Sequence, residues 1–98
     1  MAIYSYTVTL GASAEPATAD KDVRASFLRI ESEIGNDLVV FGGSDVSAAD
    51  YAGSVTANTA TIDNAVSIGA FVVQPIILKD LYFLGTAAQK IHLTAILP

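Results

Sequence analysis

Apolar and polar residues alternate along two runs of the chain, one near each end. The first run is Ile3–Leu10, whose apolar face consists of Tyr4, Tyr6, Val8 and Leu10. The second is Ile91–Leu97, in which the polar positions are His92 and Thr94. Because successive side chains of a strand point to opposite faces, this alternation predicts two half-buried β-strands.

Between Val23 and Glu31 the alternation changes phase. Val23, Ala25 and Phe27 share one face, whereas Leu28 and Ile30 share the other. A β-bulge near Phe27, or a strand buried on both faces, would produce this pattern.

Turn residues divide the rest of the chain into short segments. Gly35-Asn36-Asp37 predicts a turn between the preceding strand and a strand at Leu38–Phe41, which Gly42 and Gly43 end. Ser44–Gly53 is expected to be a loop with one helical turn at Ala48-Ala49-Asp50.

The pattern is weaker from Ser54 onward. It indicates a short β-pair, Ser54-Val55 with Thr59–Ile62, while Asp63–Gly69 is ambiguous. Pro75 interrupts Phe71–Leu78, which favours an edge strand or a covering loop. Leu81–Leu84 and the last strand are expected to form a hairpin around Gly85–Gln89.

Seven to eight short strands with turns at this spacing predict an all-β fold. We expect a small β-sandwich, jelly-roll or Ig-like, that forms a single domain over residues 1–98.

Composition changes the picture because the chain has more apolar residues than a small core can hide. Hydrophobic residues make up 52% of its 98 residues and charged residues 15%, and its mean hydropathy is +0.50. A soluble domain usually has about 25% charged residues. We therefore expect part of the surface to be buried against neighbouring molecules, in an oligomer or a larger assembly.

A membrane does not account for this apolar surplus. The longest stretch without Asp, Glu, Lys or Arg is Asn64–Leu78, which is shorter than the ~20 apolar residues of a spanning helix. Residues Met1–Ser5 lack the basic and apolar regions of a secretion signal. We expect a soluble protein, made in a cytoplasm, with no membrane partner.

Charge argues against nucleic acid as a partner. The formal net charge is −5, and the five cations, Lys21, Arg24, Arg29, Lys79 and Lys90, form no basic stripe.

The residues that catalysis and metal binding need are scarce. The chain has no cysteine, and its single histidine, His92, is expected to be a partly exposed sheet residue. Asp20-Lys21-Asp22 has the spacing of a calcium loop but no later Glu at a suitable distance, so a solvated turn is favoured. We expect no catalytic residue, no metal and no cofactor, and hence a protein that is not an enzyme.

Aromatic and apolar side chains are the better candidates for function. Tyrosine is favoured at interfaces because it combines a large apolar area with a polar end. The alternative is that these residues only cover the core. The candidate interface residues are Tyr4, Tyr6, Phe71, Val72, Val73 and Ile76.

Two segments carry a resemblance to a known class of proteins. Residues 35–47, GNDLVVFGGSDVS, and residues 81–92, LYFLGTAAQKIH, resemble segments of small tailed-bacteriophage structural proteins. The likeness extends from Val23 to the C-terminus. Such proteins are virion components, among them head decoration (cement) proteins.

The resemblance implies a function in the virion. We expect a capsid decoration protein that forms a homo-oligomer, a dimer or a trimer, on the capsid exterior. It would bind the major capsid protein and stabilise the head against internal pressure. The alternative is a tail or tail-fibre structural or receptor-binding module, for which the loop with Asp50 and Tyr51 is the candidate site.

Overall fold

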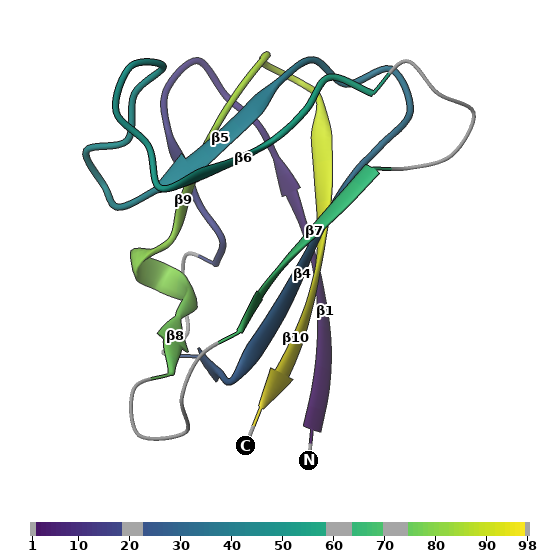
Figure 1. Ribbon diagram of the computed structural model, residues 1–98, viewed down its shortest axis with the longest axis vertical. Helices are drawn as coiled ribbons and strands as arrows, with labels where there is room; N and C mark the ends of the chain where they lie inside the picture. Colours follow the sequence, from purple (N-terminus) through teal and green to yellow (C-terminus); the bar gives the residue numbers. More distant parts are fainter. Residues whose placement is uncertain (1, 19–22, 59–63, 70–74, 98) are drawn as a thin grey trace.

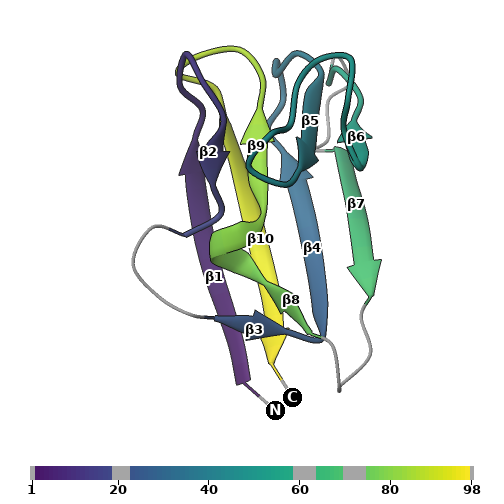
Figure 2. The ribbon, with the colours of Figure 1, turned by 90° about the vertical axis from the view of Figure 1, so that its left-hand side faces the viewer.

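The computed structural model describes residues 2–18, 23–58, 64–69 and 75–97, which form an all-β fold of two packed layers (Figures 1 and 2). The strands in this part of the chain are β1 (Ala2–Thr9), β2 (Glu15–Pro16), β3 (Arg24–Ala25), β4 (Phe27–Ser32), β5 (Val39–Gly42), β6 (Gly53–Val55), β7 (Asn64–Gly69), β8 (Ile76–Ile77), β9 (Tyr82–Leu84) and β10 (Lys90–Leu97). A single 3₁₀ turn, η1 (Leu78–Asp80), precedes β9.

The strands pair in a nested order. The first pairs with the last, β1 with β10, and inside this pair follow β2 with β9, β3 with β8, β4 with β7 and β5 with β6. All of these pairs are antiparallel. The chain thus folds as one long ribbon that doubles back between β5 and β6.

Two further pairings roll this ribbon up. β10 also pairs with β4, and β9 also pairs with β5. The results are a four-stranded sheet of order β1-β10-β4-β7, here called the long sheet, and a second sheet of order β2-β9-β5-β6. Eight strands in these two orders make a jelly roll. The two-stranded sheet β3-β8 continues the second layer below β9 (Figures 1 and 2).

The core lies between the two layers. The inner face of the long sheet contributes Val8, Leu28, Ile30, Leu93 and other alternating residues, all buried. The second layer contributes Phe41 and Phe83, whose ring centroids lie 6.0 Å apart. The alternation predicted for β1 and β10 is therefore confirmed over most of both strands.

The change of phase near Phe27 has a specific cause. The chain passes from β3, in the two-stranded sheet, to β4, in the long sheet, and Ser26 lies between them. Both the backbone N–H and the hydroxyl of Ser26 donate to the carbonyl of Ile96. Phe27 consequently points outward and does not share a face with Ala25, which corrects the face assigned to it from the sequence.

Two predicted strand pairs are wrong in the same way. The segments around Gly35-Asn36-Asp37 and Gly85–Gln89 were expected to join paired strands, but each connects a strand of one sheet with a strand of the other. Gly35 has a φ of +91°, so the predicted turn exists. It directs the chain across the core because β4 and β5 already have other partners.

The segments predicted with least pattern have mixed outcomes. Asp63–Gly69, ambiguous in the sequence, contains β7. Phe71–Leu78 was expected to be an edge strand or a covering loop; its described part contains the short strand β8, and residues 71–74 lie outside the described residues. At Ala48–Asp50 there is a turn and no helix, because Ser47 and Asp50 exchange backbone hydrogen bonds. The strand expected at Thr59–Ile62 lies outside the described residues.

Three buried polar residues form hydrogen bonds where the chain passes from β4 to the second sheet. The Asn36 amide donates to the Ser32 hydroxyl at 3.0 Å and to the Lys90 carbonyl at 2.6 Å. The Asn58 amide donates to the Ser32 carbonyl at 3.1 Å. Asn36 and Asn58 are also joined through their backbones. Since all three are buried, these bonds satisfy groups that water cannot reach.

Replacing Asn58 by alanine is expected to destabilise the protein. The change leaves the Ser32 carbonyl without this donor inside the core, which should lower the free energy of unfolding by about 2 kcal/mol. Thr56→Ala, an exposed position two residues earlier, is the control and should change it by less than about 0.5 kcal/mol. Urea unfolding followed by circular dichroism measures both, and equal effects would contradict the role given to Asn58.

Candidate interaction surface

β1 is the edge strand of the long sheet. Within the described residues it pairs with β10 and with no strand on its other side. It has eight residues, AIYSYTVT, with no charge, proline or glycine. Exposed edges are usually protected by shortness, charge or proline. The edge strands of the second sheet follow that rule, because β6 has three residues and β2 has two, one of which is Pro16.

Tyr4 and Tyr6 lie on the inner face of β1. Their rings stack with centroids 6.4 Å apart and planes 19° apart. Tyr6 is partly buried and packs against the core, whereas Tyr4 remains 48% exposed. Covering the core thus accounts for Tyr6 and leaves half of Tyr4 unexplained.

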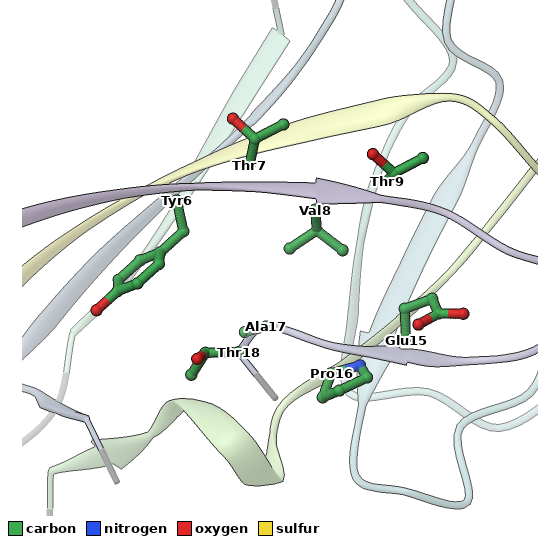
Figure 3. A pocket seen from close by; sticks show the side chains of 8 residues that line it. All are labelled: Tyr6, Thr7, Val8, Thr9, Glu15, Pro16, Ala17 and Thr18. Carbon is green, nitrogen blue, oxygen red and sulfur yellow. The ribbon is translucent and has the colours of Figure 1, made fainter. Parts of the chain in front are cut away.

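A groove of about 310 Å³ runs beside the C-terminal half of β1. Its walls are Tyr6–Thr9 from β1 and Glu15–Thr18 from β2 and the residues after it. Figure 3 shows the side chains of Tyr6 and Val8 pointing toward the β2 segment, while Thr7 and Thr9 point away from it. The groove is therefore the open seam between the two layers at the β1 edge.

The other predicted interface residues are not part of this edge. Ile76 lies in β8, opposite Ala25 of β3, and packs partly buried against the core. Phe71, Val72 and Val73 lie outside the described residues. Of the predicted set, the structure brings together Tyr4 and Tyr6.

The sequence reasoning missed a second apolar feature, on the outer face of the long sheet. Ile3, Ile96 and Phe27 are opposite one another on three neighbouring strands, and we call them the apolar row. Ile3 is 63% exposed, Phe27 is 37% exposed, and Ile96 is partly exposed. The available signal was one large apolar residue within the polar phase of each strand.

Apart from the small residues Ala65 and Gly69 of β7, the rest of this outer face is polar. Arg29 forms an ion pair with Glu31 at 2.8 Å. His92 lies with Nδ1 3.1 Å from the Thr7 hydroxyl and with Nε2 3.6 Å from the Glu33 carboxylate. The expectation that His92 is a partly exposed sheet residue is confirmed. The apolar row is thus an isolated apolar strip beside polar and charged neighbours.

The loop that contains Tyr51 forms a smaller surface feature elsewhere. Tyr51 is 48% exposed and, with Asp45 and Asp50, lines a depression of about 270 Å³ next to Gly42 and Gly43. In the described part of the chain, no group of three or more His, Asp or Glu side chains lies close enough together to hold a metal ion.

In comparisons with known proteins, no family model, no curated protein and no solved structure matches the chain. Nor does any helix among the described residues have the length and apolar character required to cross a membrane.

Two single variants, Ile3→Thr on the outer face of the long sheet and Ile30→Thr on its inner face, should differ in stability. Ile30 is fully buried, so Ile30→Thr should cost about 3 kcal/mol of unfolding free energy through lost packing and a buried hydroxyl. Ile3→Thr should cost less than about 1 kcal/mol because most of the side chain already contacts water. Thermal and urea unfolding of the two variants measure the difference. A large loss in Ile3→Thr would show that the apolar row serves stability.

Proposed function

We propose that this protein is a bacteriophage capsid decoration protein that binds the outer surface of the head shell through the major capsid protein. The observation that carries the proposal is the apolar row of Ile3, Ile96 and Phe27, fully or partly exposed on a face whose other outward side chains, apart from the small Ala65, are polar. The resemblance of residues 35–47 and 81–92 to tailed-phage structural proteins supports it from the sequence.

Residues 35–47 and 81–92, which carry the resemblance, contain the two central strands of the second sheet, β5 and β9. The first contains the turn after β4 and all of β5, and the second contains β9 and the crossing to β10. β5 and β9 pair with each other. The resemblance therefore concerns how the sandwich is built, and the contacts with a shell come from other residues.

The apolar row suits a repeated, modest contact. Its side chains project from three paired strands, so little conformational freedom is lost when a partner covers them. Such a strip provides limited binding energy per copy, but a shell offers hundreds of equivalent sites. A bridging oligomer then gains avidity from two simultaneous contacts. Added contacts between neighbouring shell subunits oppose expansion under internal pressure.

The copy number in purified virions is the first test. Quantitative mass spectrometry of virions from the phage that encodes the chain should find a decoration protein in hundreds of copies, and electron microscopy should place it on the head. A handful of copies located at the tail would overturn the proposal.

A charge placed in the apolar row should abolish binding to shells. Ile3→Asp introduces a carboxylate where the partner surface excludes water, and we expect binding to expanded shells to weaken at least about a hundredfold. Ala65→Asp is the matched control, since Ala65 is exposed on the same outer face, on β7, and lies away from the row. Cosedimentation with shells stripped of the protein measures both. Equal binding by the two variants would show that the row is not the contact.

The tail-fibre alternative is favoured by one observation, the half-exposed Tyr51 beside Asp45 and Asp50 in a shallow depression. Sugars bind to aromatic faces flanked by polar groups that fix their orientation. A receptor-binding module should give clear hits on a glycan array that Tyr51→Ala removes. An array without hits would leave this second function without support.

A further inference from the structure

The backbone of β1 has a defined set of groups that point to the free edge. In an antiparallel sheet, the N–H and C=O of successive residues point alternately to the two neighbouring strands. The Ile96 carbonyl accepts from Ser26 and the Lys90 carbonyl from Asn36, both on the β4 side of β10. Ile91, Leu93, Ala95 and Leu97 therefore bond toward β1.

The register carries this alternation over to β1. Those four residues lie opposite Val8, Tyr6, Tyr4 and Ala2. The Leu10 N–H, which donates to the Gln89 carbonyl, continues the same phase. The remaining backbone N–H and C=O groups of β1 point to the free edge, away from β10. They belong to Ile3, Ser5, Thr7 and Thr9, which we call the edge residues.

From this geometry we propose that β1 pairs antiparallel with β1 of a second copy about a two-fold axis at Tyr6, joining the two long sheets into one eight-stranded sheet. Directly opposed residues of two paired strands point to the same face of the sheet. The inner and outer faces of the two copies therefore stay continuous only if an even-numbered residue lies opposite an even-numbered one and an odd-numbered residue opposite an odd-numbered one. With the axis at Tyr6, Ile3 lies opposite Thr9 of the other copy and Ser5 lies opposite Thr7.

No other position of the two-fold axis pairs all four edge residues. An axis at Ser5 would place Thr9 opposite a residue beyond the start of β1, and an axis at Tyr4 or Val8 would leave more of them unmatched. Centred on Tyr6, the four pair among themselves and form about eight hydrogen bonds, two for each opposed pair.

The inner side chains fit the same register. Tyr4 of each copy comes opposite Val8 of the other, over the groove lined by Val8 and Ala17, and the two Tyr6 residues face each other. This gives the half-exposed Tyr4 ring an apolar partner in a groove of about 310 Å³. The contact is isologous, as a two-fold interface requires. β1 carries no charge, so the net charge of −5 sets no like charges of β1 against each other.

The dimer adds a bridging geometry to the proposed function, and the biological role given to the dimer rests on that proposal. A two-fold axis perpendicular to the sheet leaves both outer faces on the same side. Each dimer then presents two apolar rows to one surface, as a molecule that bridges neighbouring shell subunits requires.

Because the chain has no native cysteine, single cysteines report the register directly. In the proposed pair, the Cα atoms of Ser5 and the opposing Thr7 are about 5.5 Å apart, within the range of a disulfide. Mixing Ser5→Cys with Thr7→Cys protein under mild oxidation should give a cross-linked dimer. Ser5→Cys alone should not cross-link, since its two copies would be about 8 Å apart. Efficient cross-linking of Ser5→Cys alone, or none in the mixture, would overturn the proposal.

Proline at an outward position tests the hydrogen bonds. Thr7→Pro removes an N–H that points to the free edge and leaves the backbone hydrogen bonds with β10 intact, although the contact of the Thr7 hydroxyl with His92 is lost. The dimer dissociation constant should rise about tenfold to a hundredfold. Ser67→Pro is the matched control, because Ser67 has the corresponding outward position on β7, the opposite edge of the same sheet. Circular dichroism checks that both variants fold.

Sedimentation velocity of the full chain and its variants gives the decisive result. A dimer weakened by Thr7→Pro and unchanged by Ser67→Pro supports the pairing, and a protein that stays monomeric to about millimolar concentration overturns it. Shell binding is scored separately. A dimer that fails to bind shells leaves the pairing standing and removes the proposed function, whereas a monomer that binds shells removes the pairing alone.

Discussion

The fold depends on β10 pairing with strands on both of its sides. β10 is far from both β1 and β4 in the sequence, yet it lies between them and pairs with each in the long sheet. Without β10 the sheet would separate into an isolated β1 and the β4·β7 pair, and Ile91, Leu93 and Ala95 would leave the core. The network of Ser32, Asn36 and Asn58 reinforces the same place, since Asn36 donates to the Lys90 carbonyl where β10 begins.

The central place of β10 determines which surfaces are open. It leaves β1 at one edge of the long sheet and β7 at the other. It also aligns Ile3, Ile96 and Phe27 across three strands, although their positions in the chain are unrelated. The β1 edge and the apolar row therefore share Ile3. The first suits pairing with another copy, while the second suits contact with a flat partner surface.

Much of the fold was predictable from local pattern, and the failures have a common cause. Alternation identified β1 and β10 and the inward direction of Tyr6, Val8 and Leu93, because it records which side chains face the core. It could not identify pairing partners, so Gly85–Gln89 was interpreted as a hairpin loop although β9 and β10 belong to different sheets. For the candidate site, alternation placed Tyr4 and Tyr6 together on one face of β1, as the structure does. The apolar row was missed because Ile3, Phe27 and Ile96 become neighbours only through the register.

The nested order of pairing also has a kinetic consequence. β5 and β6 are close in sequence, whereas Ala2 and Leu97 of the outermost pair are separated by nearly the whole chain. Closing a long loop costs more entropy than closing a short one, and each inner pair shortens the loop that the next must close. Folding that starts at β5 and β6 and proceeds outward thus ends with β1, and the high contact order predicts a time of milliseconds to seconds. In a crowded cell, the β1 of another copy could reach a vacant β10 during that interval, so the strand best exposed for assembly is also the strand most open to domain swapping.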